Sequence, residues 1–127
     1  MTPRAADYLN GRRILVVEDD ALIAMMVEDM LLDLGCRVMG TARGIAEALA
    51  LVATGEPPDA ALLDVNLDGT MVYPLADALR ARGVALIFCT GYAEDVLRET
   101  DRGCVVLRKP YRPHELAAAL AAALHPA

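Results

Sequence analysis

Cysteine and histidine are scarce in this sequence, which argues against a disulfide scaffold and against a soft metal site. The three cysteines, Cys36, Cys89 and Cys104, are odd in number and widely spaced, have apolar neighbours and form no Cys-x-x-Cys pair. This pattern is typical of reduced, buried thiols. His114 and His125 lie in or beside the last expected helix without a paired ligand or nucleophile, so we expect them on the helix surface.

Positive charge and long apolar runs are also lacking. Twelve Lys and Arg stand against 18 Asp and Glu, and the formal net charge of −6 opposes binding to nucleic acid. No apolar run reaches membrane-spanning length, and residues 1–13 lack the apolar stretch of a secretory signal. We therefore expect a soluble cytoplasmic protein that binds neither nucleic acid nor a membrane directly.

The length of 127 residues fits one domain, and no internal repeat or low-complexity linker divides the chain. We predict an N-terminal extension over residues 1–12 and one folded domain over residues 13–127. That division leaves no room for an attached output domain.

Short apolar, β-branched runs alternate five times with stretches of helical periodicity. The alternation is typical of a parallel sheet with helices on both faces. We expect strands at 14–17, 37–39, 60–63, 84–89 and 105–107. The expected helices lie at about 21–34, 45–54, 74–82, 94–99 and from 113 onward.

The apolar residues of the first two helices predict which sides are buried. Asp20 can cap the first helix. Its expected inward stripe is Leu22, Ile23, Met26, Val27, Met30, Leu31 and Leu34, with Met25 also packed. For the second helix the expected inward residues are Ile45, Leu49 and Val52.

Polar residues follow four of the predicted strands where each strand ends. Glu18 and Asp19 follow the first, Asp64 the third, Thr90 the fourth and Lys109 the fifth. Ligands of open α/β sheets bind outside the carboxyl ends of the strands, so these side chains should converge.

The converging residue types suggest phosphoryl chemistry assisted by a metal. Clustered carboxylates repel one another unless a cation lies between them, and oxygen ligands suit Mg²⁺. Asp64 could then accept a phosphoryl group as an acyl phosphate, with Lys109 neutralising the transferred oxygens and Thr90 donating a hydrogen bond.

Four motifs resemble those of the receiver domains of two-component response regulators: ILVVEDD at 14–20, LLDV at 62–65, CTG at 89–91 and RKPY at 108–111. Their order and spacing make the combination specific, and the resemblance covers the chain from Arg13 onward. It implies a flavodoxin-like α/β fold, (βα)₅, with a doubly wound five-stranded parallel sheet in the order 2-1-3-4-5.

The resemblance also implies individual roles. Asp64 would be the phosphoacceptor that becomes 4-aspartylphosphate and would also bind Mg²⁺. Asp19 would be an inner-sphere metal ligand, Glu18 would act directly or through water, and Asn66 would bind through its backbone carbonyl. The peptide bond between Lys109 and the following proline would be cis.

The sequence departs from the usual receiver pattern in two places. The loop VNLDG at 65–69 lacks the common proline, and we expect Asp68 to serve only the turn. Val106 occupies the position where many receivers have a switching aromatic, and either Tyr92 or Tyr111 could replace that aromatic.

The segment FCTGY at 88–92 resembles the motif of FATGUY regulators, although Cys89 replaces its alanine. Members of that subfamily are often single-domain proteins that work with HWE-type or related histidine kinases. DVNLDG at 64–69 and residues 73–79 are also similar to that group.

We therefore expect a phosphorylation switch in a phosphorelay, a monomer or weak dimer. It would receive its phosphoryl group from a histidine kinase or a phosphotransfer protein and signal by protein contacts, for which a downstream regulator is a candidate partner. A phosphate sink and a phosphate-independent interaction module are the alternatives, and the latter is kept open by the missing aromatic. We expect no enzymatic activity beyond the protein's own phosphorylation and dephosphorylation, because no second Asp follows Asp64 at two residues for general acid work.

Overall fold

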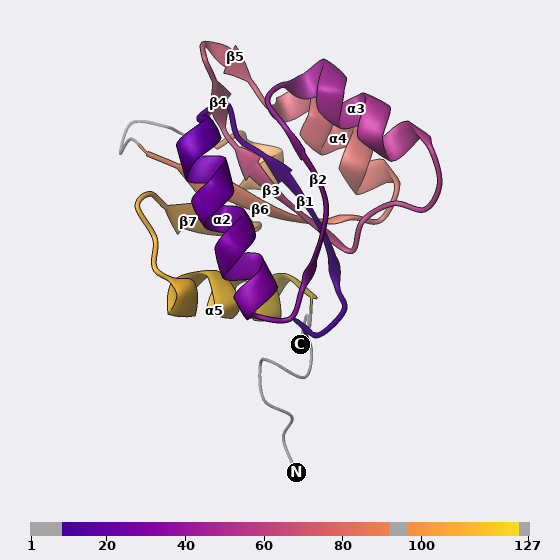
Figure 1. Ribbon diagram of the computed structural model, residues 1–127. Coiled ribbons are helices and arrows are strands. Elements are labelled where there is room, and N and C mark those ends of the chain that lie inside the picture. Colours follow the sequence, from indigo (N-terminus) through magenta and orange to yellow (C-terminus); the bar gives the residue numbers. More distant parts are fainter. Residues whose placement is uncertain (1–8, 92–96, 125–127) are drawn as a thin grey trace.

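Five parallel strands form the central sheet of this computed structural model, which describes residues 9–91 and 97–124 (Figure 1). The strands are β1 Arg13–Val17, β2 Arg37–Ala42, β3 Ala60–Asp64, β6 Ala85–Thr90 and β7 Val105–Arg108. Their spatial order is β2-β1-β3-β6-β7, which is the predicted order 2-1-3-4-5. A short antiparallel hairpin, β4 Asn66–Leu67 and β5 Thr70–Met71, follows β3.

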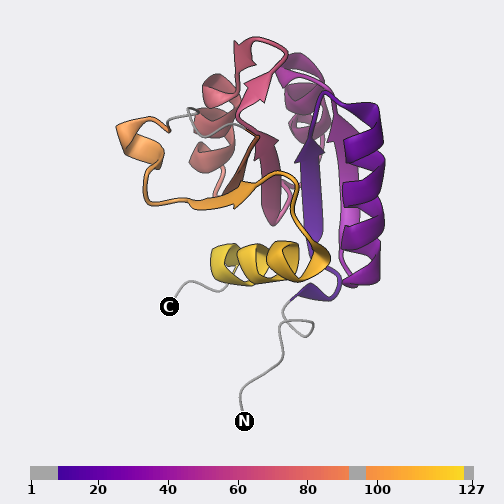
Figure 2. The ribbon, with the colours of Figure 1, turned by 90° about the vertical axis from the view of Figure 1, so that its left-hand side faces the viewer.

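Helices cover both faces of the sheet, as Figure 2 shows. The helices α2 Ala21–Asp33 and α5 Pro113–Leu124 pack on one face, whereas α3 Ile45–Ala53 and α4 Tyr73–Ala81 pack on the other. The 3₁₀ turn η1, Glu99–Asp101, precedes β7. No helix in the described part of the chain is long and apolar enough to span a membrane.

The core is divided into two layers by the sheet. Leu15 and Val17 of β1 point into the layer beneath α3 and α4, and Ile14 and Val16 point into the layer beneath α2 and α5. Because successive residues of a strand face opposite sides, a strand covered on both faces is apolar throughout. Leu9, which lies in the predicted N-terminal extension, is fully buried in the second layer.

The predicted inward stripe of α2 is partly wrong. The buried residues are Ala24, Val27 and Leu31, while Leu22 and Met25 are 67% and 62% exposed. Met26 is also more than half exposed, and Ile23, Met30 and Leu34 only border the core. The helix is apolar on almost every side, so its periodicity could not select the buried one.

A similar error affects α3. Ala48 and Val52 are buried, Ile45 is partly buried against the core, and Leu49 is exposed. The small Ala48 lets the helix approach the sheet closely, and a pattern based on large side chains overlooks such a position.

The remaining differences concern element ends and the connection before β7. β2 continues to Ala42 instead of ending at Met39. Of the predicted helix over 94–99, residues 94–96 lie outside the described residues. The prediction is wrong for Leu97 and Arg98, which are not helical, and Glu99 begins η1. Tyr92 and His125 also lie outside the described residues. His114 is exposed and all three cysteines are free, although Cys104 is only partly buried.

Candidate functional site

The carboxyl ends of four strands place the polar residues at one edge of the sheet. Glu18 and Asp19 directly follow β1, and Asp64 is the last residue of β3. Thr90 ends β6, where it pairs with Arg108 beside Lys109, and Asp64 pairs with Cys89. Parallel strands of similar length thus bring together residues that are distant in the sequence.

Glu18, Asp19 and Asp64 form a compact acidic cluster. One carboxylate oxygen from each residue lies within 4.8 Å of the others. Glu18 and Asp64 are 4% and 7% exposed, whereas Asp19 is more accessible to solvent. The donor set consists only of oxygen atoms, and such a set could hold a hard cation such as Mg²⁺.

Lys109 joins two of these carboxylates. Its Nζ lies 3.0 Å from Asp64 Oδ2 and contacts Glu18 Oε1 at short range. The backbone N–H of Lys109 donates to the Thr90 carbonyl at 2.8 Å, and the Lys109–Pro110 peptide bond is cis. The ammonium therefore lies between two buried acids.

Burial and crowding alter the proton affinities in the cluster. Burial and the hydrogen bond with Glu18 raise the pKa of Asp64 to about 7, although Lys109 opposes this rise. The pKa of Asp19 is lowered: burial opposes the shift, but hydrogen bonds with Glu18 and Asp64 outweigh it. Burial would lower the pKa of Lys109, yet its hydrogen bonds to Glu18 and Asp64 raise it. A bound cation would thus compete with the proton on Asp64.

A cavity of about 660 Å³ opens above the acidic cluster. Its polar wall contains the three clustered acids, Asn66 and Lys109. Its apolar wall comes from α2 and from the segment after β7, and includes Ile23, Met26, Met30 and Tyr111. This α2 wall was not predicted, because the apolar periodicity of the helix placed Met26 in the core.

Asp20 and Asn66 have local roles that the structure makes visible. Asp20 Oδ1 accepts hydrogen bonds from the N–H groups of Leu22 and Ile23, at 2.9 and 3.1 Å, so it caps α2 as predicted. The Asn66 side chain accepts from the Gly69 N–H at 2.7 Å and closes the hairpin turn. Asp68 has a positive φ of 50° in that turn.

Tyr111 and Tyr92 are the two candidates to replace the switching aromatic that is missing at position 106. Tyr111 is partly buried and borders the cavity, and burial raises the pKa of its phenol well above the usual range. Tyr92 lies outside the described residues. Val106 is 43% exposed on β7.

Residues 14–121 match the family model described as the response regulator receiver domain. Because this match covers most of the chain, the chain belongs to that family. The predicted receiver family and the predicted fold are therefore both confirmed.

Its relatives include the phyllosphere-induced regulator PhyR of Methylorubrum extorquens, which is 34% identical over 94% of this chain. The chain spans only 45% of the length of that protein. The solution structure of SdrG from Sphingomonas melonis Fr1 is 45% identical, with a TM-score of 0.79, and the match covers 92% of this chain and 98% of SdrG. The BeF₃-activated conformation of SdrG, attributed to Pseudomonas melonis Fr1, matches with 44% identity and a TM-score of 0.76 over 88% of this chain and 95% of that one.

Proposed function

We propose that this protein is a phosphorylation switch that accepts a phosphoryl group on Asp64 from a histidine kinase or a phosphotransfer protein. The observation that supports this most is the position of the Lys109 ammonium, 3.0 Å from Asp64 and in contact with Glu18. Asp64 lines a cavity large enough to admit a phosphoryl group. A buried carboxylate beside a fixed cation fits an acceptor whose charge increases during the reaction.

The transfer is a displacement at phosphorus. An Asp64 carboxylate oxygen forms the new P–O bond, the P–N bond of a donor phosphohistidine breaks, and the donor nitrogen keeps the bonding electron pair. Lys109 stays within reach of the transferred oxygens, and Thr90 would donate its hydroxyl hydrogen to one of them. Hydrolysis of the acyl phosphate by water would return Asp64 and release inorganic phosphate.

Glu18, Asp19 and Asp64, together with the Asn66 backbone carbonyl, would hold Mg²⁺. When bound, this cation supplies charge neutralisation for the phosphoryl oxygens. The cluster fits it, because three carboxylates converge while Lys109 supplies one positive charge.

A donor would approach across the exposed face of α2. Met26 borders the cavity, and Leu22 and Met25 are exposed on the same helix. Exposed apolar side chains beside a reactive pocket are typical of a protein contact surface. We therefore place the donor contact there, with signal output through protein contacts elsewhere on the domain.

A phosphate-independent interaction module is the second candidate. The exposed Val106 favours it, because an aromatic at that position is a usual part of the receiver switch. A phosphate sink uses the same Asp64 chemistry without an output partner, and only the fate of the phosphoryl group separates it from a switch.

The test is intact-mass measurement after incubation with Mg²⁺ and acetyl phosphate. We expect the wild type to gain one phosphoryl group, and Asp64→Asn or the wild type without Mg²⁺ to gain none. Absence of labelling of the wild type by acetyl phosphate and by histidine kinases would favour the interaction module.

A further inference from the structure

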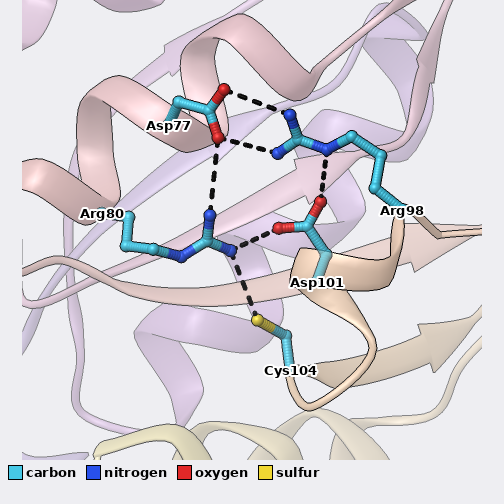
Figure 3. A network of polar contacts seen from close by, with 5 residues as sticks. All are labelled: Asp77, Arg80, Arg98, Asp101 and Cys104. Carbon is cyan, nitrogen blue, oxygen red and sulfur yellow. Dashed lines mark hydrogen bonds and ion pairs between the residues drawn. The ribbon is translucent and has the colours of Figure 1, made fainter.

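An ion-pair network ties the connection between β6 and β7 to the surface of α4 (Figure 3). Asp77 and Arg80 come from α4, whereas Arg98, Asp101 and Cys104 come from the connection. The pairs Arg80–Asp101 and Asp77–Arg98 each join residues that are 21 positions apart, so these two are tertiary contacts and not helix-surface pairs.

In the outer part of the network, the side chain of Arg98 lies against the exposed face of α4. Both Asp77 oxygens accept hydrogen bonds from the Arg98 guanidinium, at 2.8 and 3.1 Å. The same guanidinium lies 4.4 Å from the centre of the Tyr73 ring. We call this arrangement of Tyr73, Asp77 and Arg98 the Arg98 clamp. Its ion pair is solvent-accessible, so it can break at low cost.

The inner part of the network is different because Asp101 is fully buried. Arg98 Nε donates to Asp101 at 2.7 Å, and Arg80 donates to its other oxygen and to Cys104 Sγ. A buried carboxylate needs these partners, so this part is expected to persist when the clamp opens. Loss of Asp77 removes the Arg98 contact and the longer contact of Asp77 with Arg80 Nη1 at 3.5 Å, and leaves the hydrogen bonds to Asp101 in place.

The clamp is connected to the candidate site along β6. The Tyr73 ring packs against Phe88, with centroids 6.5 Å apart, and Phe88 precedes Thr90 by two residues on the same strand. A displacement of Thr90 toward a phosphoryl group on Asp64 would thus act on the clamp through Phe88 and Tyr73.

We propose that the Arg98 clamp is an autoinhibitory contact that favours the unphosphorylated conformation. This inference rests on the proposed function, because it assumes that Thr90 moves when Asp64 is modified. The clamp packs Arg98 on Tyr73, and Tyr73 packs on Phe88 of β6, so a conformation in which the end of β6 has moved strains or breaks the clamp. Removing the clamp takes away a contact of the resting state and shifts the population toward the modified conformation.

The experiment is a titration of the full chain with beryllofluoride, a phosphoryl mimic, in excess Mg²⁺. Amide signals of Gly91 and Lys109 in nuclear magnetic resonance spectra report site occupancy. Asp77→Asn keeps the shape of the side chain and should lower the midpoint by about two- to fivefold, the range set by one exposed ion pair. Asp33→Asn removes an equal charge from an exposed position on α2 and should leave the midpoint unchanged.

A second variant separates the clamp from a general charge effect. Arg98→Gln removes the clamp and also the Arg98 Nε hydrogen bond to Asp101, which keeps its hydrogen bond from Arg80. The variant makes the chain more negative, so general electrostatics would weaken binding of the anion, whereas loss of the clamp should strengthen it as Asp77→Asn does. Opposite shifts in the two variants, or wild-type midpoints in both, would overturn the clamp and leave the proposed function intact. A wild-type chain that takes up no beryllofluoride would overturn the proposed function, and the regulatory role of the clamp with it.

Discussion

Lys109 Nζ lies 3.0 Å from Asp64 Oδ2, and this ion pair joins the end of β7 to the end of β3 across the site. The same ammonium contacts Glu18, so one positive charge serves two buried acids. The third acid, Asp19, keeps the cluster more negative than Lys109 can neutralise. The excess negative charge is the physical reason to expect a cation here.

The raised pKa of Asp64 predicts that, without a bound cation, the stability of the fold falls as the pH rises. An unfolded Asp releases its proton near pH ~3.9, whereas burial and Glu18 raise the folded pKa to about 7. The stability that this proton contributes is present below the unfolded pKa and is lost as the pH rises through about 7. Asp64→Asn cannot ionise, so it should melt about 3–6 °C above the metal-free wild type at pH 8, and the difference should be smaller at pH 5.

Thermal unfolding with added Mg²⁺ checks the same account. The cation competes with the proton, so it should raise the wild-type melting temperature more at pH 8 than at pH 5. It should have little effect on Asp64→Asn. An equal Mg²⁺ effect at both pH values would contradict the competition.

The N-terminal end of α2 offers a test of capping. Asp20→Ala should lower the free energy of unfolding by about 1 kcal/mol, because two backbone N–H groups lose their acceptor. Asp20→Asn should keep the stability, since Asn caps equally well. In urea titrations with and without Mg²⁺, a large loss of metal binding in Asp20→Asn, comparable to that of Asp19→Asn, would instead assign Asp20 to the metal.

The buried Asp101 is expected to carry most of the stability of the ion-pair network. Burial raises its pKa, but hydrogen bonds from Arg98 and Arg80 outweigh burial and lower it. Its contribution is therefore present above the unfolded pKa and is lost as the pH falls through the lower folded value. Asp101→Ala should cost about 1–3 kcal/mol at pH 7, less than a fully buried pair, because both arginines can turn to water.

Urea unfolding at pH 7 and in acid measures this difference. We expect the wild type and Asp101→Ala to approach each other as the pH falls below about 4. Unchanged urea midpoints at pH 7 would show that Asp101 contributes nothing.

Substitutions on the exposed and the buried side of α2 should differ in their effect on stability. Met25→Gln should change the free energy of unfolding by no more than about 0.5 kcal/mol, because Met25 is exposed. Leu31→Ala should cost about 2–5 kcal/mol, because Leu31 is fully buried.

Met25→Gln should also slow labelling by a histidine kinase that phosphorylates the wild type, and leave labelling by acetyl phosphate unchanged. Neither Met25 nor Leu32 lines the cavity, and Leu32→Gln, at an exposed position about two turns further along α2 from the site, is the matched control.

The sheet and the convergence at its edge were predictable because they follow from local signals. The apolar strand of β1 and the polar residues that follow it identify both the strand and its end. Parallel order then brings Glu18, Asp64 and Lys109 to one edge, where the structure has them. The cap at Asp20 was predictable for the same reason, since capping depends on neighbours in the chain.

The rest depended on contacts that no local pattern encodes. On α2, Met25 and Val27 are equally apolar, and only the approach of the sheet decides that Val27 is buried. The pairing of Asp77 with Arg98 joins two ordinary surface charges from separate elements. From the sequence alone, neither residue can be told from a charged side chain that is simply exposed to solvent.

Location of the phosphoryl group by chemical trapping tests the central claim most directly. After incubation with Mg²⁺ and acetyl phosphate, borohydride reduces an aspartyl phosphate to homoserine, and fragment mass spectra identify the altered position. We predict conversion at position 64 and at no other carboxylate, with none when Mg²⁺ is omitted. Conversion at another residue, or a labelled chain with Asp64 unaltered, would contradict the account.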